Sequence, residues 1–176
     1  MKKLQNGTIR NCVGLEDFAK VFKVFESFPF FESWSDDEVR EEYESFQHGG
    51  IIFGYYADDG ECAGILTMKP YEPGKHPVKY PSDAKVMYLS DVATRFEYRN
   101  QGIGTHLSEH AIRHLEVLGY DYIYLRTNEE NSMSYGIAKR CGFVQLFDII
   151  EEVERRRTDG TVAKDARIFM EKKLSK

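Results

Sequence analysis

Apolar residues recur with two different periods along this chain, and the changes of period mark short helices and strands. Leu15, Phe18, Phe22 and Phe25 recur at helical spacing, which predicts an amphipathic helix that stops near Pro29. A second helix is predicted to begin at residue 35, and its apolar face continues to residue 46. Further helices are predicted over residues 103–118 and 133–141.

The start of the second helix carries a strong local signal. Ser35 and Glu38 form a predicted capping box, in which the hydroxyl and the carboxylate accept hydrogen bonds from free amides of the first turn. Trp34 and Val39 occupy the staple positions on either side. These residues predict a helix end that does not depend on distant contacts.

Strands are predicted between and after these helices, at residues 8–12, 51–57, 61–69, 85–94, 121–127, 143–154 and 166–174. Asp-Gly pairs at residues 59–60 and 159–160 predict two hairpin turns. The segment from Pro70 to Ser82 holds four of the five prolines, so it is expected to be a loop rather than a central strand.

The resulting order is β-α-α-β-β-β-α-β-α-β-β. The strand–helix–strand unit in the middle implies one parallel pair, and the remaining connections are mostly antiparallel hairpins. We therefore expect a mixed α/β sheet with helices on both faces. The length of 176 residues suits a single domain over residues 1–176.

Composition narrows the range of functions. A net charge of −5 disfavours a nucleic-acid partner. The three cysteines form no C-x-x-C pair, the N-terminus resembles no signal peptide, and no apolar run could span a membrane. We expect a cytoplasmic monomer or homodimer without membrane contact. His106, His110 and His114 recur every four residues, but no carboxylate or cysteine pattern supports a metal site.

The most informative segment is Arg99-Asn100-Gln101-Gly102-Ile103-Gly104, between a predicted strand and a predicted helix. Glycines allow a ligand close to the backbone, and the free amides of a helix start favour a diphosphate. A dinucleotide fingerprint fails because Leu107 stands at the third glycine position, and no Gly-Lys-Ser/Thr of a P-loop follows. A tight turn without a ligand remains the alternative.

The pattern R-x-x-G-x-G after a strand resembles the coenzyme A loop of the GNAT superfamily of N-acetyltransferases. Asn131, followed by Gly142-Phe143, resembles the "N…GF" signature of that superfamily. The similarity is strongest from Val86 to Phe143 and weak before Gly49. It implies the GNAT fold, acetyl-CoA as the acyl donor, and transfer of the acetyl group to a primary amine of an unidentified acceptor.

The resemblance also implies where the coenzyme binds. Its pantetheine is expected between strands 85–94 and 121–127, which diverge in this fold. The expected cofactor-binding residues are Val92, Ala93, Thr94, Arg99, Asn100, Gln101, Gly102, Ile103, Gly104, Thr105 and Asn131. Asn131 has a second explanation, as the N-cap of the helix that it begins.

The catalytic residues are less clear from the sequence. Asp91 is the candidate general base, although strand alternation places it on the face opposite Tyr88 and Ser90 unless a bulge re-aims it. A carboxylate that faces solvent or stabilises a turn is the alternative. The usual acid of the family is a Tyr at the position of Ala138. Tyr135 is the substitute candidate, and a Tyr packed at the helix edge is the alternative.

The acceptor site is expected at residues 28–34, 70–82 and 155–164, by the same resemblance. The aromatic residues of the first segment suggest an apolar acceptor, or simply the packing of two helices. Because Ala138 replaces the usual Tyr, a non-catalytic acyl-CoA-binding or sensing module stays as the second functional hypothesis.

Overall fold

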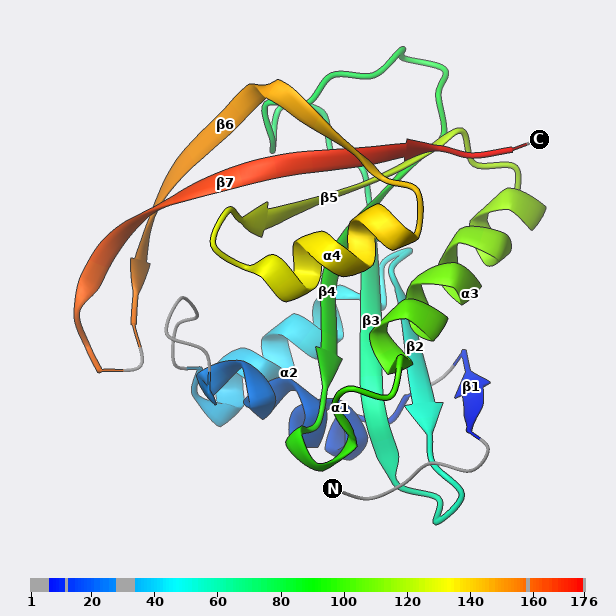
Figure 1. Ribbon diagram of the computed structural model, residues 1–176, viewed down its shortest axis with the longest axis vertical. Helices are drawn as coiled ribbons and strands as arrows, with labels where there is room; N and C mark the ends of the chain where they lie inside the picture. Colours follow the sequence, from blue (N-terminus) through cyan, green and yellow to red (C-terminus); the bar gives the residue numbers. More distant parts are fainter. Residues whose placement is uncertain (1–6, 12, 28–33, 158, 176) are drawn as a thin grey trace.

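The computed structural model contains the predicted elements in the predicted order (Figure 1). It describes residues 7–11, 13–27, 34–157 and 159–175. The strands are β1 (Thr8–Arg10), β2 (Ile51–Tyr56), β3 (Cys62–Pro70), β4 (Val86–Thr94), β5 (Tyr122–Asn128), β6 (Val144–Arg156) and β7 (Val162–Lys173). The helices are α1 (Leu15–Phe22), α2 (Asp36–Ser45), α3 (Ile103–Val117) and α4 (Ser132–Arg140), with 3₁₀ turns η1 (Lys23–Ser27) and η2 (Phe96–Tyr98).

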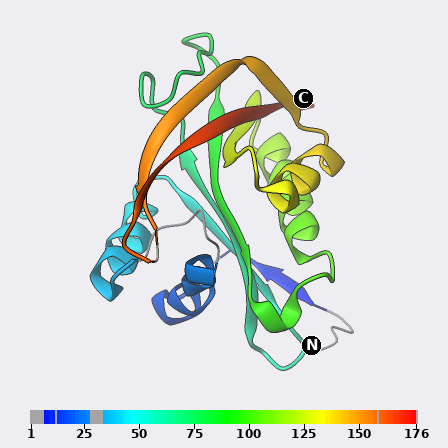
Figure 2. The same cartoon turned by 60° about the vertical axis from the view of Figure 1, so that its left-hand side comes forward.

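The described strands form one seven-stranded sheet in the order β1-β2-β3-β4-β5-β7-β6. Only β4 and β5 pair in parallel, through the crossover helix α3, and all other neighbours are antiparallel. Helices α3 and α4 lie on one face, and α1 and α2 lie on the other (Figures 1 and 2). The predicted mixed α/β architecture, with one parallel pair and helices on both faces, is confirmed.

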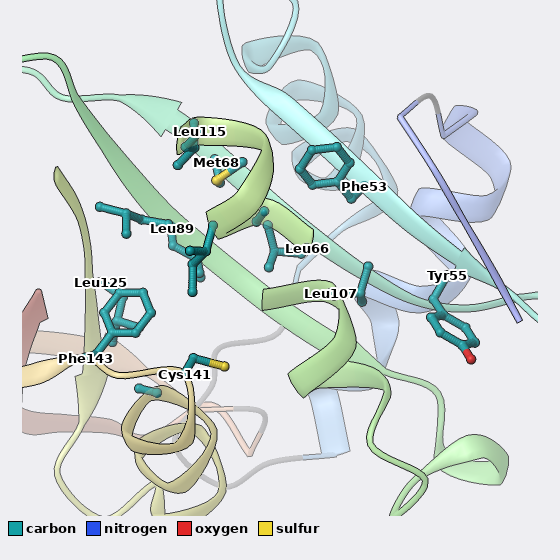
Figure 3. Close-up of a cluster of buried hydrophobic side chains, with 14 of the residues drawn as sticks. Phe53, Tyr55, Leu66, Met68, Leu89, Leu107, Leu115, Leu125, Cys141 and Phe143 are labelled. Carbon is teal, nitrogen blue, oxygen red and sulfur yellow. The ribbon is translucent and has the colours of Figure 1, made fainter. Parts of the chain in front are cut away.

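Each face of the sheet has its own apolar core. On the α3 side, Phe53, Leu66, Met68 and Leu89 from the sheet pack against Leu107 (Figure 3). On the α1 side, alternate residues of the same strands meet the aromatic side chains of α1 and α2. Strand β3 is buried along seven of its nine positions, which explains its continuous apolar sequence.

The predicted capping box is present at the start of α2. The Ser35 amide donates to Glu38 Oε2 at 2.6 Å, and the Glu38 amide donates to Ser35 Oγ at 3.2 Å. The first helix is shorter than predicted, because the chain tightens into η1 after Phe22. The predicted first strand ends at Arg10, and Cys12 lies outside the described residues.

The last hairpin extends further than the sequence predicts. Strand β6 continues to Arg156 and β7 starts at Val162, so residues 155–156 and 162–165 also pair. This extension has no alternation of apolar and polar residues that would predict a strand, because both faces of the ribbon are partly exposed beyond the core. The hairpin curves away from the sheet toward α2 and forms a wall beside the β4–β5 junction (Figure 2).

None of the helices within the described ranges has the length and apolar character that crossing a membrane requires.

Candidate active site

Strands β4 and β5 separate after a short paired region. Residues Val86–Leu89 of β4 pair with residues Tyr122–Leu125 of β5, and the pairing goes no further. Beyond this point β4 follows β3 as far as Thr94, while β5 follows β7 as far as Asn128. The facing edges of both strands therefore keep backbone groups that have no partner strand. A cleft of about 570 Å³ opens at this position.

The glycine turn closes one end of the cleft. Asn100 and Gly102 adopt left-handed φ values of 61° and 78°, and α3 begins directly after them. A Cβ on Gly102 would meet only the His106 ring, at 3.8 Å, so glycine is required here for its backbone conformation. The turn is tied to the end of β4, because Arg99 Nε donates to the Thr94 carbonyl at 3.3 Å.

The first turn of α3 is suited to an anion. No described side chain caps it, and it contains no acidic residue. The amides at a helix start carry a partial positive charge that the helix dipole reinforces. Gly102 has no side chain that would block access to these amides. Free amides at a helix start that follows a glycine are a common phosphate-binding site.

Glycine is required at position 104 for a different reason, which is close packing. A Cβ at this position would lie 2.9 Å from Ile137 Cδ1 and 3.4 Å from Val92 Cγ1. Glycine therefore allows α3 to approach α4 and β4 closely. Only Gly102 needs the left-handed conformation, so the second glycine of the motif is explained by packing.

A β-bulge re-aims Asp91 toward the α2 side of the sheet. Thr67 pairs with Asp91, but Met68 pairs with Leu89, so Ser90 is the additional residue in β4. The bulge places Asp91 on the same side as Tyr88, where strict alternation would have separated them. Thr67 Oγ1 donates to Asp91 Oδ2 at 3.1 Å.

The surroundings of Asp91 favour its protonated form. Burial, followed by the nearby Glu42 carboxylate, raises the pKa of Asp91 from 3.8 to about 6, against the opposing effects of Thr67 and Lys69. At pH 7 the carboxyl is still mostly ionised, yet it is basic enough to accept a proton. This combination suits a general base that works near neutrality.

Two substitutions should move the pKa of Asp91 in opposite directions. Thr67→Val removes the hydrogen bond that stabilises the carboxylate, so the pKa should rise by roughly 0.5 to 1 unit. Glu42→Gln removes a negative neighbour and leaves the Lys69 ammonium without its 2.7 Å ion pair, so the pKa should fall. Titration of the Asp91 carboxyl by ¹³C NMR measures both shifts, and two shifts of the same sign would contradict this account.

The cleft contains most of the residues proposed from the sequence. Asp91 lines it, and so do the cofactor-binding candidates Val92, Ala93, Thr94, Arg99, Asn100, Gly102, Ile103, Gly104, Thr105 and Asn131. Gln101 is not among the lining residues. Asn131 is the N-cap of α4, where its Oδ1 accepts from the Ser134 amide at 3.1 Å.

The structure does not bring Tyr135 to the cleft. On α4 the lining residues include Ser134, Ile137 and Ala138, whereas Tyr135 lies outside this stripe. Its ring packs against the apolar core of the α3 side, with the Lys139 ammonium 5.6 Å from the ring centroid. The arrangement corresponds to the alternative of a Tyr packed at the helix edge.

Cys141 and the histidines of α3 pack in the described structure. Cys141 is buried in the α3-side core, and burial raises the pKa of its thiol (Figure 3). The rings of His110 and His114 meet Phe53 edge-on at 4.8 and 5.2 Å, so this helix face covers the sheet. Across residues 7–11, 13–27, 34–157 and 159–175, no cluster of three or more His, Cys, Asp or Glu could hold a metal ion.

The opposite end of the cleft is lined by residues of α1, the proline-containing loop and the last hairpin. Residues 28–33 lie outside the described residues, but Trp34 lines this end, together with Phe22 and Phe25. The loop contributes His76, whose Nδ1 lies 2.9 Å from the Tyr124 hydroxyl. Burial lowers the pKa of His76 to about 4, so its ring is neutral near pH 7.

Sequence reasoning missed two arginines of this end, Arg126 and Arg167. Arg126 of β5 and Arg167 of β7 line the cleft together with Arg155. A guanidinium inside an otherwise apolar strand is a detectable signal, as at Arg126 between Leu125 and Thr127. Their proximity depends on the pairing of β5 with β7, which the sequence does not specify.

Solved structures of several acetyltransferases share this fold. An N-acetyltransferase from Staphylococcus aureus Mu50 has 16% identity and a TM-score of 0.72, with 97% of this chain and 100% of that chain covered. The ribosomal-protein-S18-alanine N-acetyltransferase from Escherichia coli has 21% identity and a TM-score of 0.70, with 97% and 96% covered. The protein yncA from Salmonella typhimurium, solved with its cofactor acetyl-CoA, has 14% identity and a TM-score of 0.69, with 98% and 96% covered.

Sequence comparison is more specific about the family. A search of curated proteins finds no match. The profile described as "Acetyltransferase (GNAT) family" matches residues 19–143, a span that includes the glycine turn, the separated strands and the Gly142-Phe143 pair. This match covers well over half of the chain, which therefore belongs to the acetyltransferase (GNAT) family.

Proposed function

We propose that this protein transfers an acetyl group from acetyl-CoA to a primary amine. The observation that carries the proposal is the cleft between β4 and β5, which joins an uncapped helix start at one end to the re-aimed Asp91 carboxyl at the other. A ligand with a diphosphate and an extended arm fits this combination. The family match makes acetyl-CoA the natural donor.

The residues of the cleft are suited to coenzyme A. The amides of Gly102, Ile103, Gly104 and Thr105 would hold the diphosphate. The free edge of β4 at Val92, Ala93 and Thr94 would hydrogen-bond the pantetheine arm in the manner of an added strand. Asn131 would add a polar contact from the start of α4, where its carboxamide already serves as the cap.

When bound, acetyl-CoA supplies a thioester whose carbonyl carbon is the electrophile. Asp91 accepts a proton from the ammonium of the acceptor, directly or through water, so that the neutral amine forms and attacks the carbonyl carbon. An alkyl amine with a pKa near that of lysine, about 10.4, is almost wholly protonated at pH 7, so this proton removal is essential. Backbone amides along β4 orient the carbonyl oxygen and stabilise the negative charge that develops on it.

No side chain is assigned here as the acid that protonates the departing thiolate. Ala138 lines the cleft where the family usually has a Tyr, and it carries no proton to donate. Tyr135 lies outside the cleft-facing stripe of α4. A thiol has a pKa of about 8.5, well below that of an alcohol or an amine, so the thiolate is a good leaving group that can depart unaided and take a proton from water afterwards.

Tyr135→Phe should therefore leave kcat within about twofold of the wild type, because the lost hydroxyl does not face the reacting groups. The measurement is thiol release from acetyl-CoA under saturating acceptor. Ala138→Tyr is the informative companion variant, since it introduces a phenol on the stripe that lines the cleft. A fall of tenfold or more in Tyr135→Phe, with unchanged acetyl-CoA affinity, would restore Tyr135 as the acid.

A second candidate function is a non-catalytic acyl-CoA sensor. It is favoured by one observation, the absence of a Tyr on the stripe of α4 that faces the cleft. Thiol release with a panel of amino acids, polyamines, aminoglycosides and peptides separates the two functions. Turnover with any acceptor supports the transferase, whereas tight coenzyme A binding without turnover across the whole panel supports the sensor.

A further inference from the structure

The acceptor end of the cleft has a positively charged wall. Directly opposite residues of antiparallel strands share a face, and so do alternate residues of one strand. Asn128 pairs with Arg167, and Arg167 pairs with Glu151 across the next ladder. Arg126 and Arg167 therefore lie diagonally on one face of β5 and β7, on the side of the sheet where Asp91 lies.

The ion pairs on this wall leave it with excess positive charge. Among the described residues, three guanidiniums share two carboxylates, because Arg126 pairs with Glu151 at 2.6 Å while Arg157 and Arg167 both contact Asp165. Desolvation, followed by repulsion from Arg155, lowers the pKa of Arg167 to about 10, and Arg126 contributes in the same direction.

Two buried polar atoms on the lining residues have no partner. Arg167 is only 5% exposed, and its Nε makes no hydrogen bond to the described residues. The hydroxyl of Ser90, the extra residue of the β4 bulge, is also buried without a partner there. Unpartnered buried donors are rare in folded proteins because each costs about 1–3 kcal/mol. A ligand oxyanion would satisfy the guanidinium with a charge-assisted hydrogen bond.

We propose that the acceptor is a small amine that also carries an oxyanion, of which an α-amino acid is the simplest form. The oxyanion binds at Arg126 and Arg167, and the amine faces Asp91 on the same side of the sheet. This inference rests on the proposed acetyl transfer, and it names the acceptor class of that site. Polyamines and aminoglycosides, which are purely cationic, would be repelled by the same wall.

The first test is a binding measurement that requires no catalysis. Calorimetry on the protein saturated with coenzyme A compares each proteinogenic amino acid with its carboxamide and its decarboxylated amine. At least one acid should bind 30-fold or more tightly than its two matched analogues. Equal binding of the three forms throughout, or no binding by any acid, would overturn the proposal. Matched 1-aminoalkylphosphonates show whether the oxyanion is carboxylate or phosphonate.

Variants of the wall arginines test whether these side chains cause the preference for an acid over its carboxamide. Arg167→Gln should weaken binding of the preferred acid at least tenfold and leave its carboxamide unaffected, while Arg167→Lys, which keeps the charge but loses the planar fork, should lie between. Coenzyme A affinity is the folding control for each variant. If Arg167→Gln does not fold, the double variant Arg126→Gln/Glu151→Gln serves in its place, because it removes a charge pair without leaving a lone ion. It should weaken binding of the preferred acid in the same way. Unchanged acid binding in the folded variants would contradict the assignment.

Acetyl transfer separates failure of this inference from failure of the proposed function. Two outcomes would overturn the oxyanion site and leave the transferase standing. One is thiol release at the same rate with amines that carry a carboxylate and amines that lack one. The other is release with C-terminally amidated peptides but with no free amino acid. Binding of acids through Arg167 without thiol release would overturn the transferase and leave the oxyanion site standing. Release with the preferred acid, and its loss with the carboxamide, supports both.

Discussion

Gly102→Glu should reduce coenzyme A affinity by at least about 100-fold, because it replaces an open anion site with a negative charge. The amides at the start of α3 are uncapped, and the space beside Gly102 is open to the cleft. Each charge-assisted hydrogen bond to a phosphate contributes on the order of 1.5–3 kcal/mol, so the loss of two accounts for this effect. Thermal shift against coenzyme A concentration measures it, since ligand stabilisation grows with the logarithm of concentration over Kd.

The experiment needs a control for backbone strain. Gly102 has a φ of 78°, so any side chain there costs about 1–2 kcal/mol of stability whatever its charge. Gly102→Ala carries this cost alone, and it should keep most of the affinity for coenzyme A. Gly119→Glu places the same charge at a left-handed glycine beyond the other end of α3 and should leave binding intact. Unchanged coenzyme A stabilisation in Gly102→Glu would remove the turn from the site.

The parts of the structure that could be predicted are those that local sequence specifies. The Ser35 capping box and the turn at Gly102 depend on residues within one helical turn of each other, and both are present. The order of elements along the chain and the one parallel pair followed from the hydrophobic pattern, the hairpin turns and one crossover. Even the separation of β4 from β5, which the family resemblance implied, is consistent with the register.

The parts that could not be predicted depend on contacts between distant segments. The orientation of Asp91 is set by a bulge that appears only in the register of β4 against β3. The absence of Tyr135 from the cleft is set by how α4 is rotated against the sheet, which helical spacing alone leaves open. Arg126 and Arg167 are 41 residues apart in the sequence and become neighbours only through the β5–β7 ladder.

Asp91→Asn should lower kcat by about 100-fold or more and remove the acidic limb of the pH–rate profile. General-base catalysis typically contributes 10²–10⁴-fold, and the amide cannot accept the proton. In the wild type, activity should rise as the pH increases through about 6, because the carboxyl must be ionised to act. Asp148→Asn, which removes an exposed carboxylate on β6, is the matched control and should change neither rate nor profile.

The same substitution should stabilise the fold at high pH. The folded protein raises the pKa of Asp91 from 3.8 to about 6, so the folded state holds this proton more tightly than the unfolded chain does. The contribution of Asp91 to stability is therefore fully present below pH 4 and is lost as the pH rises through about 6. Asp91→Asn should add ~2 kcal/mol at pH 8, or roughly 5 °C in Tm, and little at pH 4.

These two effects together distinguish a catalytic carboxyl from a structural one. A carboxylate held by favourable contacts would lose stability on substitution at pH 8, whereas a carboxyl kept basic by burial and by Glu42 gains it. Lower kcat with higher Tm at pH 8 is the result expected of a general base. A fall in both would indicate that Asp91 supports the β4 bulge through Thr67, and the loss of activity would then follow from the loss of structure.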